Sequence, residues 1–174
     1  MSEVKIVLLG YMGSGKTTIG KILAKELKCN FLDLDEYIET AEKKDVKSIF
    51  KEKGEVYFRK KENFYLNEIL AKKNNFVLSL GGGTPCFGNN MQQINEATQN
   101  SFYIRTDIAD LTARLLNQKA ERPLIANLSN NELPEFIAKH LFERSYFYNQ
   151  AHHTVHNKNK TPETAAQEIR ERLV

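Results

Sequence analysis

The fold is decided by the stretch Val4-Lys5-Ile6-Val7-Leu8-Leu9-Gly10-Tyr11-Met12-Gly13-Ser14-Gly15-Lys16-Thr17. Its first part is short, β-branched and closed by glycine, which predicts a buried strand followed by a turn. Its second part, from Gly10 to Thr17, satisfies the pattern G-x-x-x-x-G-K-S/T. Apolar residues at helical spacing follow, at Ile19, Ile22, Leu23 and Leu27. A glycine-rich loop between a strand and a helix predicts a phosphate-binding loop.

The residue types in this loop suit the phosphates of a nucleotide. Glycines let backbone N–H groups wrap around a phosphate, and the helix N-terminus adds a positive dipole. We expect Lys16 to reach the β- and γ-phosphate oxygens and Thr17 to ligate Mg²⁺. The alternative is an accidental glycine turn before a helix, which the agreement of motif and context disfavours.

Further strands are predicted at Cys29 to Asp35, Phe76 to Leu80, Phe102 to Ile104 and Thr154 to Val155. Helical patterns fill the gaps, and a final helix is expected to start at Thr161-Pro162. Strands that alternate with helices imply right-handed parallel crossovers. We therefore predict an α/β fold of the P-loop NTPase class, a three-layer sandwich with a central five-stranded parallel sheet. Ligands of such folds bind at the carboxyl ends of the strands.

Composition is that of one globular domain spanning residues 1–174. The chain has 174 residues, of which 41% are hydrophobic and 27% are charged. The 25 basic and 22 acidic residues leave a formal charge of +3, which gives nucleic-acid binding no support. No apolar run suggests a membrane anchor or secretory signal, so we expect a cytoplasmic protein. We also expect a monomer. Cys29 and Cys86 are expected to be reduced thiols.

The class of nucleotide-binding protein is narrowed by what the sequence lacks. A guanine-reading N-K-x-D is missing, because the nearest string, Asn157-Lys158-Asn159-Lys160, ends in lysine. A chain this short, without a second lobe, also argues against a motor. Small kinases remain, and a regulatory nucleotide-binding protein without catalysis is the rival.

Candidate acceptor residues follow the predicted second strand. The period of a strand would place Asp33 and Asp35 on one face, so that one carboxylate reaches a metal shell and the other an acceptor hydroxyl. The alternative is that Asp35 caps a helix starting at Glu36. Arg59 and Glu62 lie three apart on a predicted helix and can pair, although such pairs are usually solvated surface features.

The triplet Gly81-Gly82-Gly83 costs backbone entropy and implies close approach of a ligand or another segment, with an unusual turn as the alternative. Two segments look like insertions on the core. A mostly helical one spans about residues 36–71. A polar one, about residues 117–131, carries Arg122 and is expected to form a mobile lid.

The motifs GYMGSGKTT, FLDLD, YFR-x-x-E, LGGGTP, ERPLI and ER-x-x-x-Y occur here in the order and spacing of shikimate kinases. The chain resembles that family from Val4 to about Ala151. The resemblance implies a nucleoside-monophosphate-kinase-like fold, with a substrate-binding segment at about residues 36–71 and a lid at about residues 117–131. It also implies transfer of the γ-phosphate of ATP to the 3-hydroxyl of shikimate, with Mg²⁺, in chorismate and aromatic amino acid biosynthesis.

The resemblance also implies roles for individual residues. Lys16, Asp35 and Arg122 would be catalytic. Nucleotide contacts would come from Gly13, Ser14, Gly15, Lys16, Thr17, Thr18 and Arg122, and the metal shell from Thr17 and Asp33. Asp35 would orient the 3-hydroxyl of shikimate, and Arg59 and Arg144 would grip its carboxylate. The backbone of Gly82 would close the pocket.

Two departures from the family pattern stand out. Tyr146 replaces the proline of the R-x-P-x-Y string, and the lid is one residue longer between Arg114 and Arg122, so Arg114 is assigned no adenine-stacking role. Tyr146, Phe147 and Tyr148 are interpreted as helix packing residues. A related kinase acting on another hydroxy acid such as gluconate is the alternative, against which the two arginines and the triple glycine weigh.

Overall fold

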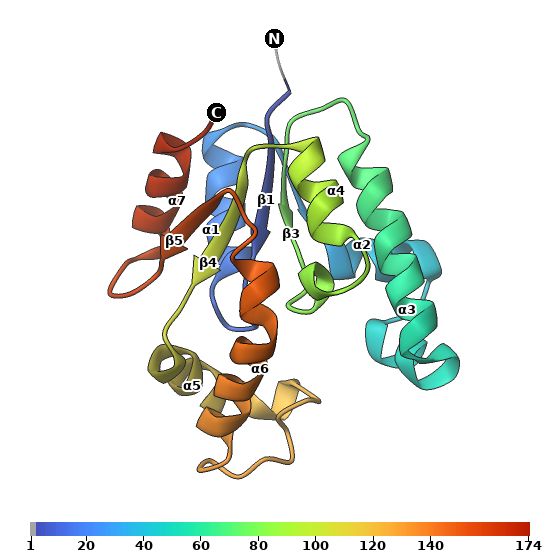
Figure 1. Cartoon of the computed structure of the whole chain (residues 1–174), viewed down its shortest axis with the longest axis vertical. Coiled ribbons are helices and arrows are strands. Elements are labelled where there is room, and N and C mark those ends of the chain that lie inside the picture. The colour runs from blue at the N-terminus through green and yellow to red at the C-terminus, as the bar shows by residue number, and fades with distance from the viewer. Residues whose placement is uncertain (1–2) are drawn as a thin grey trace.

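The computed structural model describes residues 3–174 and has a central sheet of parallel strands, shown in Figure 1. The strand order is β2-β3-β1-β4-β5, and every neighbouring pair is parallel. The strands are β1 Lys5–Leu9, β2 Asn30–Asp33, β3 Phe76–Ser79, β4 Ser101–Arg105 and β5 His153–His156. The predicted five-stranded parallel sheet is confirmed.

Helices connect the strands and extend the chain beyond them. They are α1 Lys16–Glu26, α2 Leu34–Glu42, α3 Val46–Leu70, α4 Asn90–Ala97, α5 Ile108–Leu116, α6 Leu133–Tyr148 and α7 Pro162–Glu171. Two short 3₁₀ turns, η1 Thr84–Cys86 and η2 Lys119–Glu121, complete the fold. The predicted final helix begins where expected, since Thr161 caps it by accepting from the N–H of Thr164.

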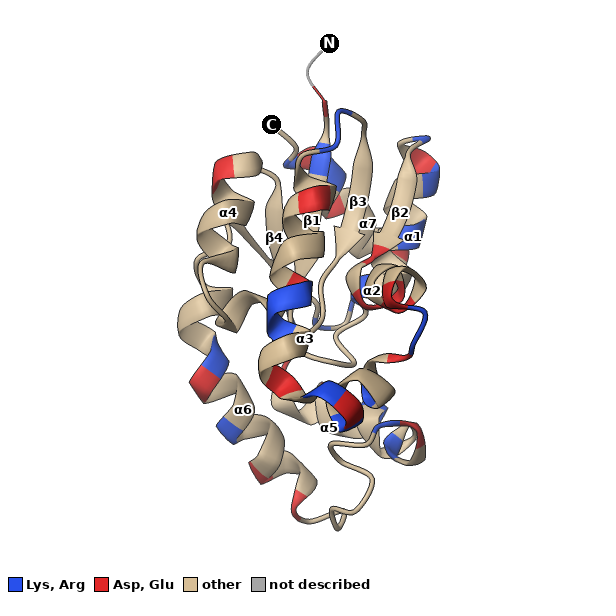
Figure 2. Ribbon diagram, turned by 90° about the vertical axis from the view of Figure 1, so that its right-hand side faces the viewer, with Lys and Arg blue, Asp and Glu red and all other residues tan. Residues whose placement is uncertain are grey.

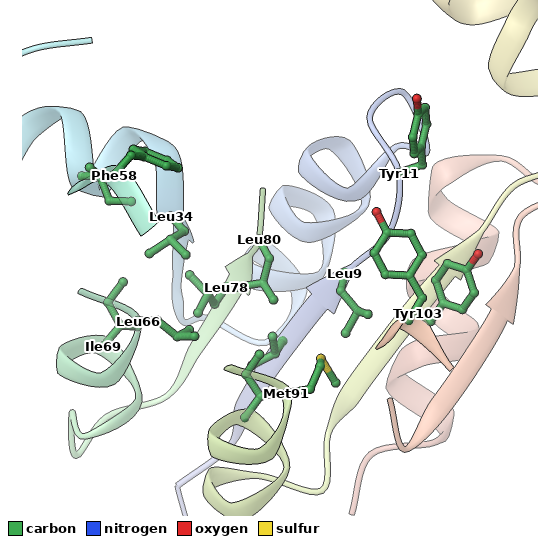
Figure 3. Packing of buried hydrophobic residues seen from close by; sticks show 14 of the residues in the cluster. Leu9, Tyr11, Leu34, Phe58, Leu66, Ile69, Leu78, Leu80, Met91 and Tyr103 are labelled. Atoms are coloured by element: carbon green, nitrogen blue, oxygen red, sulfur yellow. The ribbon is translucent and has the colours of Figure 1, made fainter. Parts of the chain in front are cut away.

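Side chains alternate between two hydrophobic cores along β1, as the period of a strand requires. Ile6 and Leu8 pack with α1 and α7 on one face of the sheet. Val7 and Leu9 pack on the other face with α3, α4 and α6, where Figure 3 shows Leu9 and its neighbours. Helices therefore cover both faces, and the predicted three-layer sandwich is confirmed (Figure 1).

The carboxyl ends of the strands point toward α5 and α6 in Figure 1. The loop after β1, the start of α2 and the glycine triplet after β3 all leave the sheet at this edge. It is the edge at which parallel α/β sheets bind ligands.

The second strand is shorter than predicted. β2 ends at Asp33 and α2 begins at Leu34, so Asp33 and Asp35 do not share a strand face. Asp33 Oδ1 accepts a 3.2 Å hydrogen bond from the N–H of Glu36, so Asp33 is the helix cap and the alternative cap, Asp35, is also wrong. A capping carboxylate followed by acidic residues starts a helix at once, which overrides the strand pattern.

Segment 36–71 is helical as predicted, in α2 and α3, and Gly54 interrupts α3 with a φ of 81°. Segment 117–131 contains the short 3₁₀ turn η2 and further turns, but no α-helix or strand. α6 runs unbroken through Tyr146, which lacks the ring constraint of proline. Tyr148 is buried in the core but Tyr146 is 73% exposed, so the packing prediction is wrong for Tyr146.

Charged residues of both signs are mixed along α3 and α6, as Figure 2 shows. Attraction for an anionic ligand must therefore come from local groups rather than from these helix surfaces. Both cysteines are free thiols, as predicted. Among residues 3–174, no helix is both long and apolar enough to cross a membrane.

Candidate active site

A cavity of about 460 Å³ opens at the carboxyl edge of the sheet. Its walls come from segments far apart in the sequence: the loop after β1, the end of β2, the glycine triplet, α5, the lid segment and the start of α7. Most of the sequence-predicted site residues line it: Gly13, Gly15, Lys16, Thr17, Thr18, Asp33, Asp35, Gly82 and Arg122. Ser14, Arg59 and Arg144 do not line this cavity.

Lys16 lies at the centre of the phosphate loop. Its ammonium group donates to the backbone oxygens of Gly10 at 2.7 Å and Tyr11 at 2.9 Å, and burial lowers its pKa to about 8. Gly13 and Gly15 have φ values of 80° and 95°, which only glycine adopts without strain. Ser14 is buried beneath the loop, with its hydroxyl 3.4 Å from the Lys16 ammonium. The Lys16 ammonium is therefore held against the loop by backbone oxygens.

Two carboxylates and a hydroxyl face the same cavity. Asp33 reaches it from the end of β2, Asp35 from the first turn of α2, and Thr17 from the start of α1. Burial raises the pKa of Asp35 to about 7, and the nearby charges of Asp33 and Glu62 add to the rise. This places a carboxyl that titrates near neutrality beside the phosphate loop, as proton-handling sites require.

The glycine triplet lies against three predicted acceptor residues, one for each glycine. A Cβ on Gly81 would lie 3.2 Å from Asp35 Oδ1, and one on Gly82 would lie 3.0 Å from Arg144 Nη1. A Cβ on Gly83 would lie 2.7 Å from Arg59 Nη2. Close approach of other chain segments therefore explains all three glycines, and an unusual turn does not have to be invoked.

Arg59 is held from α3 by a buried partner. Its Nη1 donates to Glu62 Oε1 at 2.8 Å, and Glu62 is only 1% exposed. The other oxygen of Glu62 accepts from the hydroxyl of Thr84 at 2.7 Å, which ties α3 to the turn after the glycines. The guanidinium also stacks 3.9 Å above the ring of Phe87. The pair predicted from sequence is therefore buried, and the solvated-surface alternative is wrong.

Arg144 approaches the glycine triplet from α6. Its guanidinium lies 5.5 Å from the centre of the Tyr11 ring, and no carboxylate of the described chain forms a salt bridge with it. The hydroxyl of Tyr148 donates to the backbone oxygen of Gly82 at 2.6 Å, which fixes α6 on the triplet. A cation held by aromatic groups keeps its charge available for an anion.

The lid segment contributes Arg122, whose side chain donates twice to Gln118. Arg114, to which the sequence gave no role, also lines the cavity and donates to the backbone oxygen of Gly13 at 3.0 Å. Four basic residues, Lys16, Arg114, Arg122 and Lys160, therefore line one cavity, and of these Lys160 forms a salt bridge with Glu168. Such a concentration of positive charge suits a polyphosphate.

The segment after β5 supplies cavity residues that sequence reasoning missed: Asn157, Lys160 and Pro162. The Nδ2 group of Asn157 donates to the backbone oxygen of Ser14 at 2.9 Å, while its buried Oδ1 has no hydrogen-bond partner. In the sequence this segment excludes a guanine-reading motif, and its lack of acidic residues leaves the rest of the adenine pocket unassigned. The signal that could have found it is its place directly after the last strand of a parallel sheet.

Comparisons with known proteins agree with this geometry. The family model described as shikimate kinase matches residues 12–174. A shikimate kinase of Flavobacterium psychrophilum is 47% identical over 165 residues, covering 95% of this chain and 96% of the relative. One from Flavobacterium johnsoniae has the same identity and coverage.

Solved structures match as well. The crystal structure of shikimate kinase from Bacteroides thetaiotaomicron has a TM-score of 0.89 and 37% identity, and the match covers 97% of both chains. The Acinetobacter baumannii shikimate kinase, solved in complex with shikimate, has a TM-score of 0.86 and 31% identity over 98% of this chain and 92% of that one. The chain therefore belongs to the shikimate kinase family, whose members transfer a phosphoryl group from ATP to shikimate.

Proposed function

We propose that this chain binds the phosphates of ATP around Lys16, the 3-hydroxyl of shikimate at Asp35 and the shikimate carboxylate between Arg59 and Arg144. The observation that carries the proposal is the glycine triplet. Its three members lie against Asp35, Arg144 and Arg59 in turn, directly beside the phosphate loop. One short segment thus brings an acceptor for a hydroxyl and two cations for a carboxylate within reach of the phosphate site.

The nucleotide half rests on charge and on backbone donors. Lys16 and Arg122 line the cavity, and the N-terminus of α1 adds its dipole. Phosphoryl transfer needs positioning and neutralisation of charge more than covalent chemistry. Lys16 and Arg122 bind the β- and γ-phosphates here, and Gly13, Ser14, Gly15, Thr17 and Thr18 contribute the loop that surrounds them.

The donor set also fits Mg²⁺. Thr17 and Asp33 offer a hydroxyl and a carboxylate in the same cavity, and no cluster of three or more His, Cys, Asp or Glu within residues 3–174 forms an all-protein metal cage. Mg²⁺ favours such sites, with few protein oxygens completed by waters and phosphates. Thr17 would ligate the ion and Asp33 would hold its water shell. When bound, the ion neutralises charge on the phosphates.

The acceptor half orients one hydroxyl toward the γ-phosphate. Asp35 accepts the hydrogen bond of the 3-hydroxyl, and its raised pKa suits a group that handles that proton. Arg59 and Arg144 fix the opposite end of the substrate through charge-assisted bonds to its carboxylate. Fixing both ends holds the attacking oxygen in line, and such positioning is one of the two main sources of rate in phosphoryl transfer, beside the neutralisation of charge.

Chain segments divide these tasks within one domain, residues 1–174. Residues 36–71 continue the helix that begins beside Asp35, carry Arg59 on α3 and form the substrate-binding segment. Residues 117–131 form a lid that brings Arg122 over the phosphates and excludes water, which protects ATP from hydrolysis.

The variant D35N tests the proposal. It removes the carboxylate that faces the hydroxyl and leaves the phosphate loop unchanged, so turnover should fall at least about a hundredfold while ATP binding persists. The matched control is E36Q, which alters the exposed neighbouring carboxylate on α2 and should keep normal turnover. Normal transfer by D35N with weakened ATP binding would remove Asp35 from the acceptor site.

A further inference from the structure

One neutral side chain, Gln118, holds the lid arginine. Gln118 Oε1 accepts two hydrogen bonds from Arg122, from Nε at 3.1 Å and from Nη2 at 2.8 Å. Both residues line the cavity that contains the phosphate loop. Arg122 forms no salt bridge within residues 3–174, so a neutral amide is the only side chain there that fixes its guanidinium.

The two hydrogen bonds use one edge of the guanidinium and leave another free. An arginine side chain has five N–H groups in a planar fork, and the Nε and Nη2 groups share one edge. Gln118 occupies that edge. The end of the fork, formed by Nη1 and the second N–H of Nη2, remains for a bidentate phosphate contact.

Within the lid segment the backbone of Arg122 is held in a turn, so the side chain is the part whose direction depends on another residue. The carbonyl of Arg122 accepts from the N–H groups of Ile125 at 3.1 Å and Ala126 at 3.0 Å. Ile125 is fully buried in the core, which anchors this turn. With its backbone held, the direction of the long, flexible side chain depends on what the guanidinium contacts.

The neutrality of the amide has an electrostatic consequence. A carboxylate at position 118 would bind the arginine more strongly but would offset its charge, and it would add a negative charge beside the phosphates. Glu62 can hold Arg59 as an ion pair because the shikimate carboxylate also has Arg144, a second cation that forms no salt bridge within the described chain. Arg122 is the only basic residue of the lid segment, residues 117–131, that lines the cavity.

We propose that Gln118 is a positioning residue for the phosphoryl-transfer reaction. It orients the guanidinium of Arg122 toward the transferring phosphoryl group without neutralising its charge. The inference rests on the proposed role of Arg122 and extends it to a residue that no motif identifies.

Two substitutions separate orientation from charge. Q118M removes the acceptor at nearly constant shape and should lower kcat about tenfold, with unchanged KM for shikimate and unchanged Tm. Q118E keeps the acceptor but makes it anionic, so kcat should fall at least as far and KM for ATP should rise about tenfold. Q167M on α7 is the matched control, since Gln167 is an exposed glutamine with a hydrogen bond to the residue four positions on, and its kinetics should be normal.

If the contact between Gln118 and Arg122 only holds the lid segment together, the opposite order is expected, because a glutamate would bind Arg122 more tightly and preserve activity. Parental kinetics of Q118E, or of Q118M, would overturn the proposal. In an R122M background, which should itself lose at least about a hundredfold in kcat, Q118M should add no further loss. If R122M keeps parental activity, both the proposed role of Arg122 and this inference are contradicted. If R122M is impaired and Q118M is not, only the role of Gln118 fails.

Discussion

The guanidinium of Arg59 occupies the space that a side chain would need on Gly83, since a Cβ there would lie 2.7 Å from Nη2. Gly83 has a φ of −90° and a ψ of −15°, a conformation that any residue adopts. The glycine is therefore required by the arginine beside it and not by its own backbone.

This contact predicts that G83A displaces Arg59 without unfolding the protein. Because the end of an arginine side chain is flexible, the new methyl group moves it, and KM for shikimate should rise about tenfold. Tm and KM for ATP should stay normal. Steady-state kinetics in both substrates and a thermal melt measure these quantities.

The control for that variant is G88A. Gly88 has a φ of 53° and no atom within 4 Å of a built Cβ, so alanine is strained there but touches nothing. G88A should lose about 1 kcal/mol of stability with normal KM for shikimate. A normal KM in G83A would show that Arg59 does not depend on the space at Gly83.

We expect Glu62 to affect shikimate binding because it orients Arg59. E62Q removes the buried charge that orients the guanidinium and should raise KM for shikimate about tenfold and lower the free energy of unfolding by about 1 to 3 kcal/mol. KM for ATP should be unaffected.

Glu55 provides the comparison, because it lies 3.6 Å from Arg59 Nε but its side chain is 57% exposed. Exposed ion pairs contribute little, so E55Q should have normal kinetics and stability. Equal effects of E55Q and E62Q would mean that general charge near α3, rather than the buried contact, controls shikimate binding.

Lys16 tests the phosphate loop. K16M removes a cation from a closed site and should reduce kcat at least about a hundredfold, with a smaller loss of ATP affinity. K21M changes an exposed lysine on the same helix and should have normal kcat. Near-normal turnover by K16M would mean that this loop does not serve the reaction.

Sequence reasoning located the parts of the fold that depend on local pattern. The strand ending at Leu9 and the loop through Thr17 carry their own signal, because an apolar run and glycines at fixed positions suffice. The pairing of Arg59 with Glu62 followed from helical spacing alone. Its burial did not, because burial depends on how α3 packs on the glycine triplet.

Sequence predictions were wrong or incomplete where helix capping or contacts between distant segments determine the local structure. At Asp33 a helix cap and a strand end compete, and the cap shortened the strand. Asn157 and Pro162 reach the cavity because they follow β5 at the carboxyl edge of the sheet, and their place after the last strand, rather than any motif, is the signal for them. No sequence motif marks Gln118, because its proposed role depends on an uncharged amide that contacts Arg122 in the folded chain.

Recognition of a carboxylate by Arg59 and Arg144 is tested most directly by comparing the affinity of the protein for shikimate with its affinity for the decarboxylated analogue. Each charge-assisted contact should contribute about 1.5 to 3 kcal/mol, so the parent protein should bind shikimate at least roughly tenfold to a hundredfold more tightly than the analogue. R59K cannot reproduce the planar fork and should weaken shikimate binding strongly while leaving the analogue almost unaffected. Equal binding of shikimate and the analogue by the parent protein would contradict the carboxylate clamp and the proposed orientation of the substrate.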